Sequence, residues 1–176
     1  MHTFHKEDAP KQAFAGSEED DRQVVFSGPH FKATFDKQSG LLVSYRYKKQ
    51  EYIHNGQGPR PFFWRAPTDN DYGAKLPIRL KAWKEASYQE PKTESFNVVR
   101  DKDTTAVKVT YRFPQTDTRW DITYKIYSNG VIKVDNHFVA ENAQTPMIPR
   151  VGLRMQLPAR ITSLTYYGRG PEENYR

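Results

Sequence analysis

The sequence predicts an all-β fold, an antiparallel β-sandwich with one short helix. Aromatic residues make up 14% of the 176 residues, and Val, Ile and Thr recur in short runs. This composition is typical of strands rather than helices. Apolar and polar residues alternate along many short segments, which would give each strand one apolar face. Turn residues separate these segments at intervals of roughly ten residues, the spacing of strands in a sandwich.

Residues 1–21 mix charge, Pro, Gly and Ser without apolar periodicity, so we expect a linker or disordered tail there. A folded domain is expected over residues 22–176. Its first half contains four predicted strands, over residues 23–27, 31–36, 41–47 and 51–54. Residues 36–40 (Asp-Lys-Gln-Ser-Gly) are predicted to form the loop of a hairpin, with Gly40 at its end.

Residues 78–87 are the one predicted helix. Pro77 stands near its start and good helix formers follow. Four of its residues share a face and are expected to be buried together: Ile78, Ala82, Trp83 and Ala86. The segment before it, residues 55–73, has loop chemistry and no clear period, and Phe63 is expected in the core, as is Trp83.

The second half of the chain is predicted to be an antiparallel meander. Its predicted strands cover residues 107–113, 120–126, 131–140, 151–157 and 161–167, and the first two alternate apolar with polar residues. The dipeptide Asn129-Gly130 between two of these strands suits a type I′ turn.

Composition excludes several classes of protein. The chain has no cysteine, which rules out a disulfide scaffold, a thiolate zinc site and a cysteine nucleophile. A mean hydropathy of −0.88 and the lack of a long apolar stretch argue against a membrane protein. The net charge is +6, but basic residues are scattered and interleaved with acidic ones. We therefore expect a solvated basic surface and no nucleic-acid partner.

The strongest candidate for polar chemistry is the run Asp69, Asn70 and Asp71. Its spacing does not fit a calcium-binding loop, so turn-capping side chains are expected and no metal site is predicted. Glycosidase chemistry would need two carboxylates about 5 Å apart. Asp69 with Asp71, and Glu172 with Glu173, are too close in sequence to favour that arrangement. No nucleophile elbow or phosphate-binding loop is present either.

Two segments are specific enough to resemble a known family. Residues 64–73 (Trp-Arg-Ala-Pro-Thr-Asp-Asn-Asp-Tyr-Gly) resemble the RAP-x-DND-x-G loop in the C-terminal domain of bacterial family 2 glycoside hydrolases, the large β-galactosidases. Residues 167–175 look like its second motif, G-x-GP-x-ENY. The resemblance covers residues 22–176. Motif residues expected to have structural roles are Arg65, Pro67, Gly168, Gly170, Pro171, Glu173, Asn174 and Tyr175.

The resemblance implies the fold and the role of the chain. The matching domain is the fifth of its parent enzyme, an antiparallel supersandwich similar to galactose mutarotase. It is not catalytic, because the catalytic residues and the ligands of magnesium and sodium belong to other domains. No cofactor is therefore expected in this chain. The family implies a mobile loop at the rim of the active site, with Gly73 as its pivot, running to about Leu80. Its expected rim residues are Asp69, Asn70, Asp71, Tyr72 and Gly73.

The partners implied are the remaining domains of a β-galactosidase, with the galactoside contacted only indirectly. Family members continue beyond the second motif, so a sandwich that ends at Arg176 is also expected to self-associate through uncovered edges. Two alternatives remain open. One is an autonomous carbohydrate-binding module that uses Tyr72 and neighbouring aromatic residues; Tyr72 lies in a polar loop and is the one most expected to be exposed. The other is a mutarotase-like sugar epimerase, although neither His54 nor His137 has an evident acidic partner in the sequence.

Overall fold

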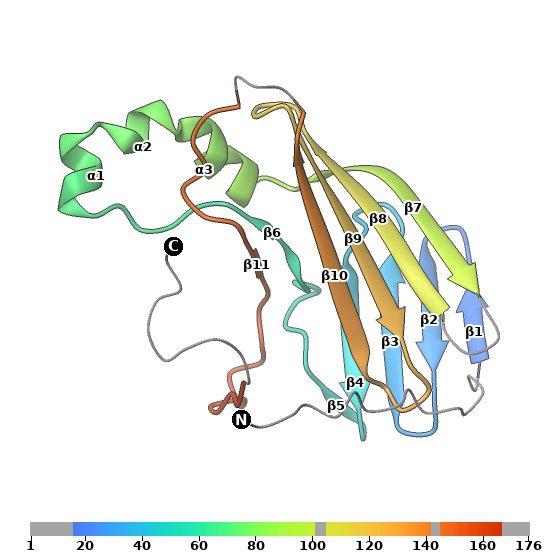
Figure 1. Cartoon of the computed structure of the whole chain (residues 1–176). Coiled ribbons are helices and arrows are strands. Elements are labelled where there is room, and N and C mark those ends of the chain that lie inside the picture. Colours follow the sequence, from blue (N-terminus) through green and yellow to red (C-terminus); the bar gives the residue numbers. More distant parts are fainter. Residues whose placement is uncertain (1–15, 101–104, 142–144, 167–176) are drawn as a thin grey trace, which may run out of the picture.

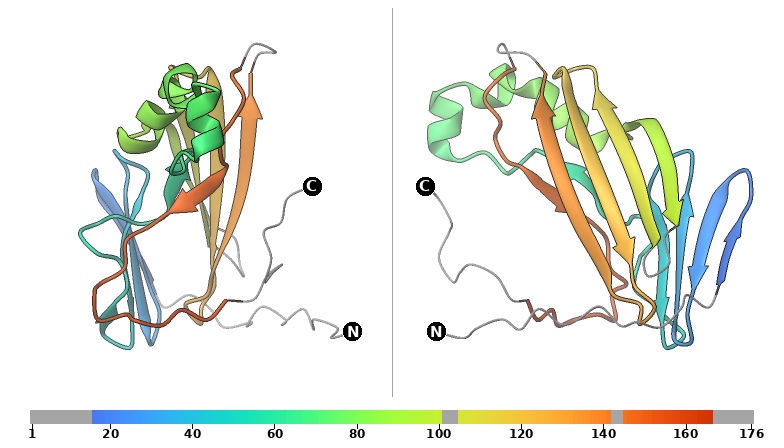
Figure 2. Two further views of the ribbon diagram at one scale, coloured as in Figure 1. Left: turned by 90° about the vertical axis from the view of Figure 1, so that its left-hand side faces the viewer. Right: turned by 45° about the vertical axis from the view of Figure 1, so that its right-hand side comes forward.

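The computed structural model describes residues 16–100, 105–141 and 145–166. Over these residues the chain is an antiparallel β-sandwich, as the sequence predicted. A five-stranded sheet and a four-stranded sheet form the two layers, and a two-stranded sheet lies beside them. Figure 2 shows the two layers edge on, with the helices gathered at one end. No helix in the described part of the chain is long and apolar enough to cross a membrane.

The five-stranded sheet is built from the N-terminal strands in sequence order. Its members are β1 (Gly16–Glu19), β2 (Gln23–Ser27), β3 (Phe31–Asp36), β4 (Leu42–Tyr47) and β5 (Gln50–Glu51). The predicted hairpin loop after β3 is confirmed. Asp36 Oδ1 accepts the Ser39 backbone N–H at 2.7 Å, and Gly40 ends the loop at φ +70°. Glycine suits that position because L residues rarely adopt a positive φ.

Two boundaries in this sheet differ from the sequence prediction. Gly16–Glu19, assigned to the linker or tail, forms β1, and its backbone pairs with β2. Ion pairs from Lys37 and Arg100 to Glu19 add to this pairing, although the strand buries no apolar residue. The strand predicted over residues 51–54 is only the two-residue β5. The turn of Lys48 and Lys49 fixes where it starts, and beyond it the Ile53 backbone N–H donates to the Glu51 carboxylate instead of to β4.

The four-stranded sheet has the order β10-β9-β8-β7. Its members are β7 (Lys92–Arg100), β8 (Thr105–Phe113), β9 (Thr118–Ile126) and β10 (Ile132–Ala140). The last three confirm predicted strands, whereas β7 was not predicted. The turn between β9 and β10 is not of type I′. Gly130 has φ +91° but Asn129 does not have a positive φ, and Gly130 N–H donates to the Tyr127 carbonyl at 2.9 Å. A type I′ turn needs positive φ at both central residues.

The two-stranded sheet pairs β6 (Arg60–Phe62) with β11 (Gly152–Arg154). It brings a segment from the first half of the chain beside one from the second half (Figure 1). The strand predicted over residues 151–157 is thus shortened to β11. Residues 161–166 form no strand, and the side chain of Leu164 is exposed there. A strand-like sequence makes a strand only where a neighbouring strand accepts its hydrogen bonds.

Three helices replace the single predicted one: α1 (Asp69–Gly73), α2 (Leu76–Arg79) and α3 (Lys81–Tyr88). Residues 69–73, predicted to lie in an irregular loop, are therefore helical. Lys75 separates the first two helices with a φ of +55°. The predicted burial is correct for Trp83 and Ala86 but wrong for Ile78, which is 76% exposed. Ile78 belongs to α2, so it does not share a face with the residues of α3.

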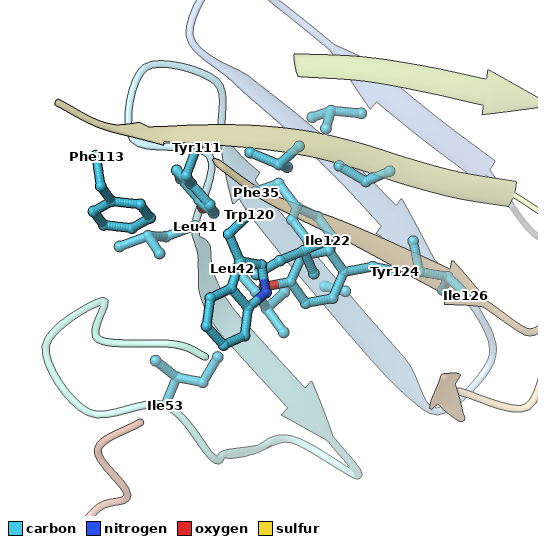
Figure 3. Close-up of a cluster of buried hydrophobic side chains, with 14 of the residues drawn as sticks. Phe35, Leu41, Leu42, Ile53, Tyr111, Phe113, Trp120, Ile122, Tyr124 and Ile126 are labelled. Carbon is cyan, nitrogen blue, oxygen red and sulfur yellow. The ribbon is translucent and has the colours of Figure 1, made fainter. Parts of the chain in front are cut away.

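The core lies between the two large sheets (Figure 3). On β8 and β9 every second side chain is buried, which is the pattern that the sequence alternation predicted. Tyr124 packs against Phe35 of the opposite sheet, with ring centroids 5.1 Å apart. Its hydroxyl donates to the Pro59 carbonyl, so a buried polar group is satisfied across the layers.

Candidate functional site

Phe63 is the anchor on which the candidate site is built. It follows β6 and its side chain is fully buried. Its ring contacts four aromatic residues at centroid distances of 4.9 to 5.7 Å: Trp83, Phe113, Trp120 and Phe138. Its backbone N–H donates to Ser87 Oγ at 2.9 Å, and that hydroxyl donates to the Trp83 carbonyl. The chain leaving Phe63 is therefore fixed both to α3 and to the four-stranded sheet.

Arg65 and Asp71 close the segment that follows into a compact turn. Two separate nitrogens of the Arg65 guanidinium contact the two carboxylate oxygens of Asp71, at 2.7 and 2.9 Å. This two-bonded geometry is the strongest form of a carboxylate–guanidinium pair. Asp71 Oδ2 also accepts the Thr68 backbone N–H at 2.8 Å, at the start of α1. Asp71 thus links the strand end to the beginning of the helix.

The environment of Asp71 keeps it ionised. The hydrogen bond from the Thr68 backbone lowers the pKa of Asp71, partial burial acts in the opposite sense, and Arg65 lowers it further. Only 8% of the residue is exposed. Asp71 is thus an acceptor already in use and is unsuited to act as an acid. The predicted turn-capping role is confirmed for this residue.

A small pocket lies between this turn and a segment that follows β10. Its volume is about 150 Å³. Trp64, Leu76 and Leu80 give it an apolar wall, and residues 147–149 close the opposite side. The Arg65–Asp71 pair forms the polar part of its lining. Lys84 of α3 lies 6.0 Å from the Trp64 ring, so a positive charge covers the outer face of that indole.

The predicted rim residues separate into two groups. Asp71 points inward, and Arg65 and Pro67 join it in lining the pocket. Asp69, Asn70, Tyr72 and Gly73 are exposed on α1, and Tyr72 is 62% exposed. A methyl group added at Gly73 would meet no atom within 4 Å. The remaining predicted motif residues, Gly168, Gly170, Pro171, Glu173, Asn174 and Tyr175, lie outside the described residues.

The arrangement offers neither a carboxylate pair nor a metal centre among the residues that the structure describes. Asp69 is exposed while Asp71 is bound to Arg65. No group of three or more His, Asp or Glu side chains within residues 16–100, 105–141 and 145–166 could hold a metal ion. The site can therefore bind or shape a neighbouring surface, but its described residues provide no acid–base pair.

One expectation about the histidines is corrected. His137 does have an acidic neighbour, because its Nδ1 lies 3.8 Å from Asp121 Oδ2. The two residues face each other across β9 and β10, where sequence reasoning could not place them together. The His137 side chain is 76% exposed on an open sheet surface. The pair therefore lacks the cleft that an epimerase would need.

Sequence reasoning missed the support of the site. Ser87 is fully buried and holds both Phe63 and Trp83. Residues 147–149, which line the pocket, stand in a Pro-rich run with no motif of their own. The one signal that could have revealed α1 is Thr68 followed three residues later by Asp71, a spacing like that of a helix-capping box.

Comparison with known proteins gives a consistent group of relatives. Residues 27–176 match the family described as "Beta galactosidase small chain". The chain is 34% identical to a beta-galactosidase of Priestia megaterium, over 90% of this chain and 15% of that protein. It is 36% identical to a beta-galactosidase of Clostridium acetobutylicum, over 88% and 17% respectively. It is 32% identical to the beta-galactosidase small subunit of Latilactobacillus sakei, over 84% of this chain and 52% of that subunit. The chain thus spans a small part of the long relatives and about half of the small subunit.

Proposed function

Because the chain belongs to the beta galactosidase small chain family, we propose that it is a non-catalytic domain of a β-galactosidase. In this proposal it acts as scaffold and supplies the rim of an active site that other parts of the enzyme build. Its partners are the remaining domains of that enzyme, which bind any metal cofactor. The proposal assigns the chain to the fifth, mutarotase-like domain of a family 2 enzyme, which hydrolyses terminal β-galactosides with retention of configuration.

The observation that carries the proposed role is the way α1 is held. The Arg65–Asp71 pair and the Thr68 backbone fix the inner side of the turn. Its outer side carries a carboxylate, an amide and a phenol ring on Asp69, Asn70 and Tyr72, all exposed. Such a combination of polar groups and a ring is suited to line the edge of a sugar-binding cleft. Gly73, at the end of α1, leaves room for the segment to shift.

A carbohydrate-binding module is the second candidate, and the 62% exposure of Tyr72 favours it. A single exposed ring could stack on a sugar without help from other domains. The pocket beside it is small, at about 150 Å³, and its wall is mainly apolar. We therefore rank the domain role first.

Titration of the isolated chain with galactose and lactose, followed by Trp fluorescence, separates these functions. The domain role predicts no saturable response, no hydrolysis of o-nitrophenyl β-D-galactoside and no acceleration of galactose mutarotation in a polarimeter. Saturable binding in the millimolar range that Tyr72→Ala abolishes would establish the module instead. Faster mutarotation would point to the epimerase. Hydrolysis by the pure chain would contradict the non-catalytic role.

A further inference from the structure

A second hollow lies away from the proposed rim and is lined by residues of β6, β11 and the end of α3. Figure 1 shows the positions of these elements. Its volume is about 310 Å³. Arg60 and Arg154 stand opposite each other in the register of the two strands, and both line it. Tyr88 also lines the hollow, as do Gln57 and Gln156, whose side chains end in amides. The lining therefore carries two positive charges and several hydrogen-bond donors.

These two arginines lack a close acidic partner within the part of the chain that the structure describes. Neither guanidinium has a carboxylate within 4.0 Å there, whereas Arg65, Arg100 and Arg112 each have one. Like charges directly opposite on paired strands destabilise a sheet. Burial and the field of Arg154 lower the pKa of Arg60, while Glu90 acts in the opposite direction. An anion between the two guanidiniums would remove this repulsion.

Both arginines are already held in place. Arg60 donates one N–H to the Ser87 carbonyl at 2.9 Å, which uses one of its five donors. The Arg154 guanidinium lies 5.2 Å from the ring centre of Phe62 and 5.8 Å from that of Tyr88. Cation–π contacts of this kind restrict the side chain without using its hydrogen bonds. Little ordering entropy would be lost when a ligand binds.

We propose that this hollow is an oxyanion-binding site, in which Arg60 and Arg154 together take the phosphate or carboxylate group of a ligand. Guanidinium groups match both anions because they present parallel N–H donors. The basic hollow around Lys32, Lys48 and Lys49 is a weaker candidate. Arg46, which also lines it, is already paired with Glu51. The assignment concerns a different surface from the Asp69–Gly73 rim and does not depend on the proposed function.

NMR titration tests the site with inorganic phosphate in one arm and acetate in the other. The side-chain Nε–H signals of Arg60 and Arg154 are followed at constant ionic strength. Saturable shifts of both signals are expected in at least one arm, and the arm with tighter binding identifies the preferred group. Arg154→Gln should weaken binding about tenfold or more. Arg154→Lys should also weaken anion binding. The variant keeps the positive charge but loses the paired N–H donors of the guanidinium and its contacts with the rings of Phe62 and Tyr88.

The matched control is Arg79→Gln, which removes the same charge from exposed α2. It should leave the affinity unchanged. Equal affinity in the unmodified chain, Arg154→Gln and Arg79→Gln would overturn the proposal, as would a lack of saturation in both arms. If Arg154→Gln does not fold, thermal unfolding of the unmodified chain tests the site instead. The proposal predicts a higher unfolding midpoint in phosphate or acetate than in sodium chloride of equal ionic strength. An unchanged midpoint in both would again overturn the proposal.

Discussion

Arg65 and Asp71 are joined by a two-bonded ion pair that spans the start of α1, with N–O distances of 2.7 and 2.9 Å. The pair ties the chain leaving the Phe63 anchor to the third residue of the helix. Because Asp71 also accepts the Thr68 backbone N–H, one carboxylate organises the whole turn. The exposed residues of α1 owe their placement to this inward contact.

Replacing Asp71 by Asn should loosen this turn. Asn keeps the size of the side chain but cannot form a charged fork with Arg65, so we expect a lower thermal midpoint and faster proteolysis between Pro67 and Leu80. Asp69→Asn is the matched control, because Asp69 is exposed on the same helix. Calorimetry and limited trypsin digestion check both variants. Equal behaviour of the two would show that the ion pair does not hold the segment.

The stability of the chain should fall in acid. Burial would raise the pKa of Asp36 and of Glu51, but hydrogen bonds outweigh it in both cases and lower each pKa. A carboxylate with a lowered folded-state pKa stabilises the fold above its unfolded pKa of about 4, and this contribution is lost as the pH falls below that value. Urea unfolding at pH 7, 5, 4 and 3 should show the decline. Glu51→Gln should be less stable at pH 7 and show a shallower decline; an unchanged slope would argue against this origin.

Phe63→Ala should remove the anchor of the site. The ring is fully buried among four aromatic neighbours, so its loss should cost about 3 to 5 kcal/mol of unfolding free energy. Phe62→Ala, at the half-buried neighbouring position, should cost about 1 to 2 kcal/mol. Chemical denaturation of both variants provides the comparison. Similar costs for the two would contradict the role given to Phe63.

Two substitutions in the turn between β4 and β5 should raise the free energy of unfolding. Lys48 and Lys49 have φ angles of +48° and +66°, which L residues other than Asn and Asp adopt at a cost. Lys48→Asn combined with Lys49→Gly supplies the residues favoured in a two-residue hairpin loop, so unfolding free energy should rise by about 1 kcal/mol. The control is the double Ala variant, which removes the same charges without relieving the strain. A matching gain in the control would assign the effect to charge.

The accuracy of the strand predictions depended on burial. β8 and β9 were predictable because one face of each lies in the core, so apolar residues recur at every second position. β7 is an edge strand with a bulge between Thr93 and Ser95, which shifts its period near its start. Residues 161–166 were predicted as part of a strand, yet they pair with no strand in the described part of the chain. Pairing partners are a tertiary property that a local pattern does not contain.

The candidate site was predicted only in part, again because a local sequence pattern does not contain tertiary contacts. Its motif residues Arg65 and Asp71 stand six positions apart, so the sequence could indicate a turn but not the ion pair that closes it. The exposure of Tyr72 and the burial of Phe63 and Trp83 followed from their surroundings in the sequence and are confirmed. Ser87 and residues 147–149 reach the site only through tertiary folding, and no local signal marks them. The role of Gly73 as a pivot stays a prediction.

The most direct test of the proposed rim compares Gly73→Ala with Gly16→Ala in the complete enzyme to which the proposal assigns this chain. An added methyl group meets no atom within 4 Å at either position, and neither glycine has a positive φ, so both variants should fold normally. Ala at the end of α1 stiffens the backbone, whereas the same change in β1 lies on another part of the sandwich. Measuring kcat and KM with o-nitrophenyl β-D-galactoside, we predict altered turnover for Gly73→Ala and unchanged kinetics for Gly16→Ala. Identical kinetics in both variants and the unmodified enzyme would contradict the assignment of Asp69–Gly73 to the active-site rim.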